Sequence, residues 1–332
     1  MATRVALDAL GGDHAPDEVV AGAVEAASDS IAPILFGPES LAGTGLEVVP
    51  CTDGIGMSDK PAEAVRAKPD ASLVRAVRAV GDGDAAAVVS AGNTGAVLAA
   101  SLLHLRRLPG VHRPGIAVVI PGRKGPTVLI DAGANADARP EHLLQFGHMG
   151  TVFAEEILDI RDPRVRLLSI GEEPEKGNQL TLEAHAMLEA SNLRFEGNLE
   201  GRALLEGDAD VVVCDGFTGN VALKTLEGTI RSVLGALRDE IRSSTKGRVG
   251  GLLIRPAARG LRARLDPDTH GGGYLLGLRG LVVIAHGSSS RVAIANATRL
   301  AARGVDHRLV ERLAERMPAT RAESRAAATG GC

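Results

Sequence analysis

The sequence predicts an α/β fold with three layers, in which a mostly parallel sheet lies between helices. Six runs of four to six apolar, mostly β-branched residues occur along the chain, and each ends in a turn rich in Gly, Asp, Asn, Ser or Thr. The runs are continuous rather than alternating, which is typical of strands covered on both faces. Helical patterns lie between the runs, and this alternation indicates an α/β domain.

The six strand-and-turn segments are TRVALDALGGDH, DAAAVVSAGNTG, GPTVLIDAGANAD, RVRLLSIGEEPEKGN, DADVVVCDGFTGN and GLVVIAHGSSS. Because every polar turn follows a strand, we expect all six turns at the carboxyl edge of one sheet, where open α/β sheets bind ligands. A single turn of this kind is equally well an ordinary connection between a strand and a helix. The six turns together favour a common binding site.

Three helices are predicted between these segments. From Asn220 to Ile241 apolar residues recur every three to four positions, which indicates one apolar stripe of a long helix. We expect further helices from Thr94 to Leu108 and from Pro140 to Leu158.

Residues 242–265 differ from the rest of the chain, because they carry seven Arg or Lys and no acidic residue among their apolar positions. Pro256 predicts a bend between two short helices. We therefore expect a basic, amphipathic helical hairpin that protrudes from an α/β catalytic domain of residues 1–317. Residues 318–332 have no pattern and are predicted to be a disordered tail.

The composition excludes several classes of protein. Five Phe, one Tyr, no Trp and a net charge of −4 argue against a nucleic-acid-binding surface. Cys51, Cys214 and Cys332 are too far apart for a disulfide framework or a metal cluster, which makes a cytoplasmic location the default. Asp8 interrupts the N-terminus too early for a signal peptide, and no apolar run approaches the roughly 18–20 residues of a membrane span.

The sequence also lacks the motifs that bind common cofactors. No P-loop and no dinucleotide-binding glycine motif is present, and no His pair has metal-ligand spacing. We therefore expect no cofactor and no metal.

The turn residues predict an anion site. Amides, hydroxyls and backbone N–H groups with a nearby lysine favour a bound anion over an apolar ligand. The residues expected to converge are Asn93, Thr94, Asn135, Asp137, Lys176, Asn178, Thr218, Asn220, Ser288 and Ser289. Asp8, Asp131 and Asp215 would repel a phosphate, so we expect them to organise the turns. His14 and His286 are each either a general base or a packing residue.

Seven motifs in a fixed order resemble the bacterial phosphate acyltransferases of phospholipid synthesis. They are DALGGDHAP, SAGNTGA, DAGANADARPEHL, EKGNQLT, GNLEGR, DGFTGNVALKTLEG and AHGSS, and the match runs from about Thr3 to about Leu300. The resemblance implies a fold like phosphotransacetylases and isocitrate or isopropylmalate dehydrogenases. It implies transfer of a fatty acyl group from acyl-acyl carrier protein to inorganic phosphate. It also implies a homodimer at the inner face of the membrane that supplies a membrane acyltransferase.

This resemblance and the turn pattern together assign roles to individual residues. The predicted catalytic residues are Lys176, His14, His286 and Asn220. The predicted substrate-binding residues are Asn93, Thr94, Asn135, Asp137, Asn178, Asp215, Thr218, Gly219, Lys224, Arg66, Lys68 and Ser288. For Lys224 the alternative is a surface lysine, and for Arg66 and Lys68 it is a solvated helix face.

The basic hairpin is predicted to contact anionic lipid or the acidic carrier protein through Leu252, Leu253, Ile254, Arg255 and Arg259. Packing between two subunits is the alternative. Three other functions stay open: a short-chain phosphotransacylase that uses acyl-coenzyme A, a decarboxylating dehydrogenase, and a membrane-binding scaffold without activity.

Overall fold

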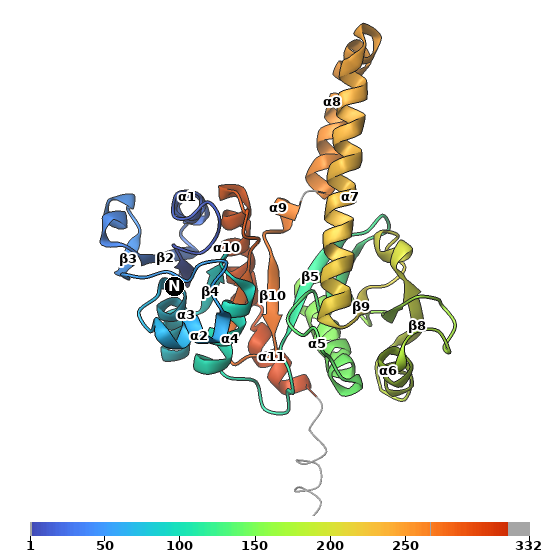
Figure 1. Cartoon of the computed structure of the whole chain (residues 1–332), viewed down its shortest axis with the longest axis horizontal. Coiled ribbons are helices and arrows are strands. Elements are labelled where there is room, and N and C mark those ends of the chain that lie inside the picture. The colour runs from blue at the N-terminus through green and yellow to red at the C-terminus, as the bar shows by residue number, and fades with distance from the viewer. Residues whose placement is uncertain (1, 266, 318–332) are drawn as a thin grey trace, which may run out of the picture.

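The computed structural model describes residues 2–265 and 267–317. Within these residues eleven strands form one sheet with the order β3-β2-β1-β4-β11-β10-β5-β6-β9-β7-β8 (Figure 1). The strands are β1 (Thr3–Asp8), β2 (Ile31–Gly37), β3 (Glu47–Pro50), β4 (Ala87–Ser90), β5 (Gly115–Pro121), β6 (Pro126–Ile130), β7 (Val165–Ser169), β8 (Phe195–Glu200), β9 (Val211–Val213), β10 (Gly273–Leu276) and β11 (Leu281–Ile284). Seven of the ten neighbouring pairs are parallel, which confirms the predicted mostly parallel sheet.

Helices cover both faces of this sheet. They are α1 (Asp17–Ala26), α2 (Pro61–Ala67), α3 (Ser72–Asp82), α4 (Thr94–His104), α5 (Pro140–Leu158), α6 (Gln179–Glu189), α7 (Gly216–Ser243), α8 (Thr245–Leu265), α9 (Pro267–His270), α10 (Arg291–Asp306) and α11 (Leu309–Arg316). Alternate strand residues point to opposite faces. Val5 and Leu7 of β1 therefore belong to an apolar cluster with α1, α5 and α10, whereas Ala6 joins α3 and α4. This arrangement confirms the predicted three layers.

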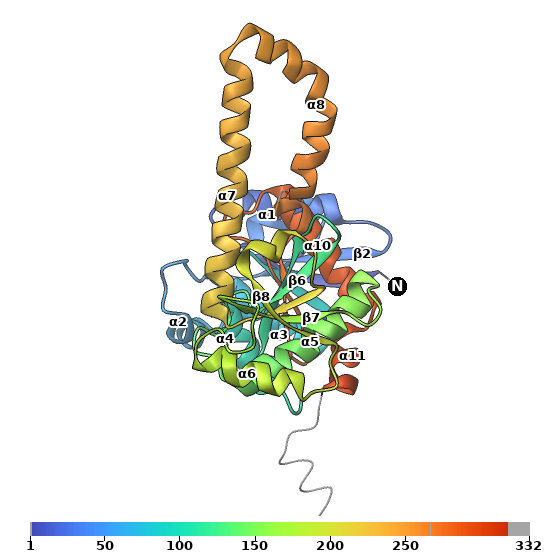
Figure 2. The same cartoon turned by 90° about the vertical axis from the view of Figure 1, so that its right-hand side faces the viewer.

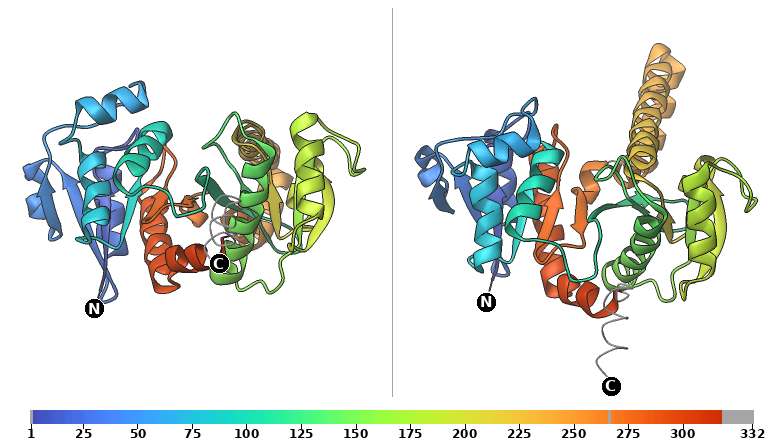
Figure 3. Two further views of the ribbon diagram at one scale, coloured as in Figure 1. Left: turned by 90° about the horizontal axis from the view of Figure 1, so that it is seen from below. Right: turned by 60° about the horizontal axis from the view of Figure 1, so that its bottom comes forward.

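The sheet consists of two parallel halves that run in opposite directions. The first half contains β1, β2, β3, β4 and β11, and the second half contains β6, β7, β8 and β9. Between them lie β5 and β10, which pair antiparallel with each other and with the adjoining strand of each half. The two halves occupy opposite sides of the molecule, and the second is coloured green to yellow-green in Figure 3.

The carboxyl ends of both halves nevertheless meet along one row of paired residues. This row crosses the sheet through Leu7, Val89, Val283, Tyr274, Ala117, Ile130, Val213 and Leu167. Each of the six predicted strands ends within two residues of it. The expectation of one common carboxyl edge is therefore wrong in its geometry. Turns after β1, β4 and β11 leave the row on one side, and turns after β6, β7 and β9 leave it on the other.

The predicted elements are present with small shifts. All six predicted strands form, and the helix predicted from Pro140 to Leu158 is α5. The helix predicted from Thr94 to Leu108 ends at His104, because Arg106 has a φ of 64°, in the left-handed region that ends helices.

The long helix predicted after β9 is α7, and it rises with α8 as a hairpin away from the sheet (Figures 1 and 2). Pro256 does not separate two short helices as expected, because it lies inside the single helix α8, which curves over the tip of the hairpin (Figure 2). The two helices separate instead at Ser244, whose backbone is extended and whose Oγ accepts a hydrogen bond from the Gly247 amide at 3.0 Å. Ser244 thus acts as an N-cap for α8. The predicted tail, residues 318–332, lies outside the described residues.

Candidate active site

A cleft of about 1780 Å³ lies over the centre of the sheet and continues between α7 and α8. Its floor includes Ile116, Val118 and Ile120 of β5. One end, which we name the head, is lined by Gly92, Thr94, Ala132, Gly133, Asn220, Lys224, Glu227, His286, Ser288 and Ser289. The head combines turns from both halves of the sheet, because the turns after β4 and β11 belong to the first half and those after β6 and β9 to the second.

The other end, which we name the arm, lies between the two helices of the hairpin. Its basic residues are Arg231, Arg238, Arg242, Arg248, Arg255, Arg259 and Arg262. Its apolar residues include Ile230, Leu234, Leu237, Ile241, Leu252, Ile254 and Leu265. Among the described residues, two carboxylates, Glu227 and Asp268, line the cleft together with these cations and Lys224. The cleft therefore favours an anion with a long apolar part.

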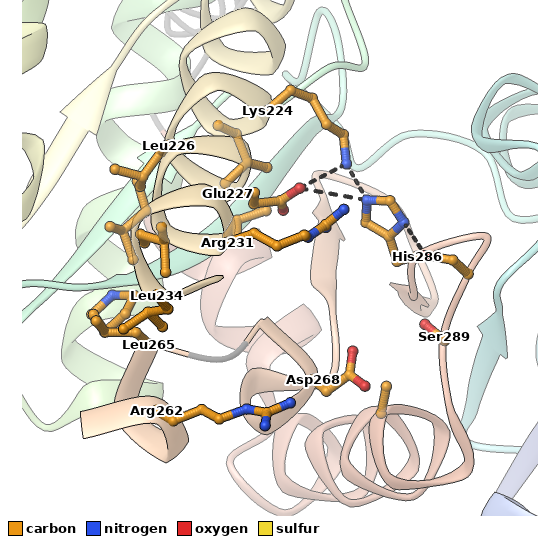
Figure 4. Close-up of a pocket in the computed structure, with 18 of the residues that line it drawn as sticks. Lys224, Leu226, Glu227, Arg231, Leu234, Arg262, Leu265, Asp268, His286 and Ser289 are labelled. Carbon is orange, nitrogen blue, oxygen red and sulfur yellow. Dashed lines mark hydrogen bonds and ion pairs between the residues drawn. The ribbon is translucent and has the colours of Figure 1, made fainter. Parts of the chain in front are cut away.

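Lys224, Glu227 and His286 form a cluster of ionisable groups in the head (Figure 4). The Lys224 ammonium lies 3.1 Å from Glu227 Oε2 and also contacts His286 Nε2. Glu227 Oε2 lies 3.6 Å from His286 Nε2, and the other ring nitrogen of His286 lies 3.3 Å from Ser288 Oγ. This cluster brings together Lys224, His286 and Ser288 as predicted site residues.

Asn220 and Thr94 also line the head, as the sequence analysis expected. Asn220 lies one helical turn before Lys224 on α7, next to the backbone of Gly133. Ser289 lines the head as well and is 4% exposed. Within residues 2–265 and 267–317, its hydroxyl has no hydrogen-bond partner. The head therefore offers three neutral polar side chains beside the charged cluster.

Asn93 is used to build the head. Its Oδ1 accepts a hydrogen bond from the Ala96 amide at 3.2 Å, which caps α4. Its Nδ2 donates to the backbone oxygens of Met57 at 3.0 Å and Asp59 at 3.3 Å. The Asn93 side chain therefore fixes the segment that carries Met57, which itself lines the cleft.

Lys68 supports the same segment from the other side. Its ammonium donates to Asp59 Oδ2 and to the Gly54 backbone oxygen, both at 3.0 Å. The hydrogen bond with Asp59 raises the pKa of Lys68, and it lowers the pKa of Asp59. Arg66 is exposed on α2 and does not line the cleft.

Asp131 and Asp215 organise the turns of the second half, as expected. Asp131 accepts hydrogen bonds from the amides of Gly133, Ala134 and Asn135 at 2.7–3.1 Å. Asp215 caps α7 by accepting from the Thr218 amide at 2.9 Å and from its hydroxyl at 2.6 Å.

Three more predicted substrate-binding residues serve these same turns. Asn135 is buried and donates to the Pro114 backbone oxygen at 2.7 Å and to Asp131 at 2.8 Å. Gly219 is close-packed, since a Cβ there would lie 1.9 Å from the Asp131 backbone oxygen. Thr218 gives its amide and hydroxyl to Asp215. These residues shape the head without lining it.

Asp8 occupies the equivalent place in the first half. It is buried, and its two oxygens accept hydrogen bonds from Ser72 Oγ at 2.5 Å and Ser90 Oγ at 2.7 Å. Burial raises the pKa of Asp8, although the two serine hydroxyls oppose this effect. Cys214 is also buried, as expected, and burial raises the pKa of its thiol well above 9.0.

Four other predicted residues also lie outside the lining of the cleft. Lys176 is exposed on the loop after β7, and β9 separates that strand from β6. Asn178 caps α6 by accepting from the Thr181 amide at 2.9 Å. Asp137 and His14 are exposed. The loop of His14 is nonetheless near the head, since the Asp13 amide donates to the Gly287 oxygen at 2.7 Å.

Glu227 and Arg231 are two of the lining residues that were not predicted from the sequence. A signal for them exists, because Asn220, Lys224, Glu227 and Arg231 follow one another at spacings of four, three and four on α7. Such spacings place side chains on one helix face. The sequence prediction rested on the apolar stripe of this helix and included only Asn220 and Lys224 from the polar stripe beside it.

The described helices include none that is both long and apolar enough to cross a membrane. Within the same residues, no group of three or more His, Cys, Asp or Glu side chains is arranged to hold a metal ion.

Comparisons with known proteins give consistent relatives. A family model described as fatty acid synthesis protein matches residues 3–312. A phosphate acyltransferase from Heliobacterium modesticaldum is 47% identical over 327 residues, covering 95% of this chain and 98% of that protein. One from Pelotomaculum thermopropionicum is 46% identical over 318 residues and covers 93% of both chains.

Among solved structures the chain is similar to phosphotransacetylases. The enzyme from Streptococcus pyogenes has a TM-score of 0.60 at 18% identity, and the EutD enzyme from Staphylococcus aureus has 0.59 at 16%. Both matches cover 92% of this chain and 94% of the other. This similarity confirms the phosphotransacetylase-like fold.

Proposed function

Because the chain belongs to the fatty acid synthesis protein family, we propose that it transfers a fatty acyl group from acyl-acyl carrier protein to inorganic phosphate. The product is an acyl phosphate for phospholipid synthesis. The observation that carries the proposal is one continuous cleft with a charged head and a long basic and apolar arm. Such a cleft fits a substrate with a reacting polar end, anionic groups and a long apolar chain.

The reaction needs one bond to form and one to break. A phosphate with a second pKa near ~6 is largely a dianion at neutral pH, and its oxygen attacks the thioester carbonyl carbon. The tetrahedral intermediate then breaks its carbon–sulfur bond, and the electron pair leaves with sulfur. The leaving thiol has a pKa of about 8.5, so it departs as thiolate or takes a proton.

The head supplies the groups that this reaction uses. The ammonium of Lys224 binds phosphate or the developing oxyanion, and Asn220 and Thr94 donate neutral hydrogen bonds. One oxyanion donor is worth about 3–4 kcal/mol. His286 holds the proton that neutralises the thiolate. The Ser289 hydroxyl, buried and without a partner in the described part of the chain, is a further donor to substrate.

The proposed catalytic roles of Lys176 and His14 require that their loops reach the cleft. Both lie outside the cleft lining in the single chain, although the loop of His14 adjoins the head. The β7–α6 loop, or the same loop of a second subunit in the proposed homodimer, has to bring Lys176 to the cleft.

The hairpin supplies the proposed contact with lipid or with the carrier protein. Leu252, Leu253 and Ile254 are 68%, 80% and 48% exposed on α8, and Arg255 and Arg259 are close by in sequence. Basic residues near an anionic membrane surface contribute about 1 kcal/mol each. The same hairpin walls the arm of the cleft, so that a bound acyl chain would lie beside the lipid-facing surface.

The direct test is to mix the protein with long-chain acyl-acyl carrier protein and inorganic phosphate and to measure acyl phosphate. We expect phosphate-dependent formation of acyl phosphate and release of the free carrier thiol. Activity confined to short-chain acyl-coenzyme A would favour the alternative, a short-chain phosphotransacylase. Absence of acyl phosphate with both donors would contradict the proposal.

A further inference from the structure

We propose that Glu227 is a positioning residue, which holds Lys224 and His286 against each other in the head of the cleft. The inference rests on the proposed function, because it assigns Glu227 a task in that reaction. It concerns a carboxylate that lies between two groups expected to touch the substrate.

The contacts of Glu227 single it out from the other acidic residues of α7. Its side chain is 13% exposed, whereas Lys224 and His286 are 45% and 47% exposed. One oxygen, Oε2, lies 3.1 Å from the Lys224 ammonium and 3.6 Å from His286 Nε2 (Figure 4). The buried member of the cluster is therefore the anion, and the two more exposed members face the cleft.

Glu227 also connects the two halves of the sheet. Lys224 and Glu227 lie on α7, which follows β9 of the second half. His286 follows β11 of the first half. In the cluster these two halves meet through ionisable side chains, so the position of His286 relative to Asn220 depends on Glu227.

Glu227 is a carboxylate in this setting. Burial opposes its charge, but the hydrogen bonds from His286 and Lys224 outweigh burial and lower the pKa of Glu227. The other charged residues of the lining drawn beside it are Arg231 on α7, Arg262 on α8 and Asp268 on α9 (Figure 4). A fixed anion at this point orders a flexible lysine, because the ion pair restricts the positions of its ammonium.

The consequence for the reaction is alignment. Lysine has four rotatable bonds, and an untethered ammonium would sample positions away from phosphate. Misplacement of a reacting group by about 1 Å can cost roughly 10²-fold in rate. A purely stabilising role for the Lys224–Glu227 pair predicts a different outcome, namely a lower melting temperature with an unchanged pH–rate profile.

The experiment compares Glu227→Gln, Glu227→Asp and the control Asp239→Asn, an exposed acid on the same helix outside the lining. All are checked for melting temperature, then assayed with acyl-acyl carrier protein and phosphate. We expect Glu227→Gln to lower kcat by about 10- to 100-fold and to change the pH–rate profile, because the reacting groups are no longer held in place. Glu227→Asp restores part of kcat, and Asp239→Asn leaves it unchanged.

A second measurement tests the positioning role of Glu227 independently of the proposed function. Diethyl pyrocarbonate modifies accessible neutral imidazoles, and mass spectrometry gives the rate at His286. We expect Glu227→Gln to raise this rate several-fold. A folded Glu227→Gln variant with wild-type kcat, pH profile and modification rate would overturn the inference. A wild-type protein that makes no acyl phosphate would overturn the proposed function, while the modification rate still decides whether Glu227 positions His286.

Discussion

The two halves of the sheet each place an aspartate at the carboxyl end of a strand near the head, and they bind it in different ways. Asp8 of the first half accepts hydrogen bonds from the hydroxyls of Ser72 and Ser90. Asp131 of the second half accepts four backbone amides and the side-chain amide of Asn135. A hydroxyl can donate or accept, whereas a backbone N–H can only donate. Replacing the aspartate by asparagine should therefore destabilise the protein less in the first half than in the second half.

The largest effect is expected for Asp131→Asn. The new NH₂ group cannot accept, so at least two of the five N–H groups that now point at the carboxylate lose their partner. Each buried donor without a partner costs about 1–3 kcal/mol, which predicts a loss of about 2–6 kcal/mol in the free energy of unfolding. Urea unfolding at pH 7 measures this loss. A change below about 1 kcal/mol would remove the contrast between the halves.

Asp8→Asn is the matched substitution in the first half, and we expect a change within about 1 kcal/mol at pH 7. The hydroxyls of Ser72 and Ser90 can reorient so that one accepts from the new amide. A loss as large as that of Asp131→Asn would show that the type of donor does not matter.

The difference in stability between Asp8→Asn and the wild type is expected to depend on pH, and the pKa of Asp8 fixes the direction of this dependence. Burial raises the pKa of Asp8 above its ordinary 3.8 in the folded state. The folded protein thus binds this proton more tightly, and the stabilisation is complete below pH 3.8 and lost as the pH rises through the raised pKa. The stability of Asp8→Asn relative to wild type should therefore increase with pH from 3.8 upward. A flat difference would show that Asp8 titrates normally.

The two serine partners of Asp8 are expected to differ from each other. Ser90 Oγ donates to Asp8 and also accepts from the Gly92 amide at 3.0 Å, and Gly92 lines the head. Ser90→Ala should cost about 1–2 kcal/mol and reduce turnover several-fold, while Ser72→Ala should cost about 1 kcal/mol. Unfolding curves and acyl-phosphate assays separate the two. Equal effects on turnover would mean that the Gly92 bond does not affect the head.

The sequence was sufficient to predict much of the fold. Six strands were recognisable because a continuous apolar run leads into a polar turn, and both α5 and α7 had clear patterns. β5 has the apolar run GIAVVIP but continues into a hairpin with β6, so it lacks the strand–turn–helix pattern that identified the other strands. β10 is four residues long, and it separates the two halves. Their opposite directions depend on these two strands, which explains the wrong expectation of one carboxyl edge.

The candidate site was predictable where chemistry and local position coincide. Thr94, Asn220, Lys224 and His286 follow strands that end at the common row, and all four line the head. Lys176 follows a strand of the same kind, but β7 lies two strands away from β6 and its loop is exposed. The order of strands in a sheet comes from tertiary pairing, so position after a strand did not reveal this distance.

The central claim is that the two halves form one catalytic unit, and a double-mutant cycle across the halves tests it most directly. Lys224→Met alters the second half, His286→Ala alters the first, and acyl-phosphate formation is measured for both and for the double variant. We expect each single variant to lose about 10²-fold in kcat. The kcat of the double variant should be only slightly below that of the less active single variant. A double variant whose loss equals the product of the single losses would contradict the claim, because the two side chains would then act independently.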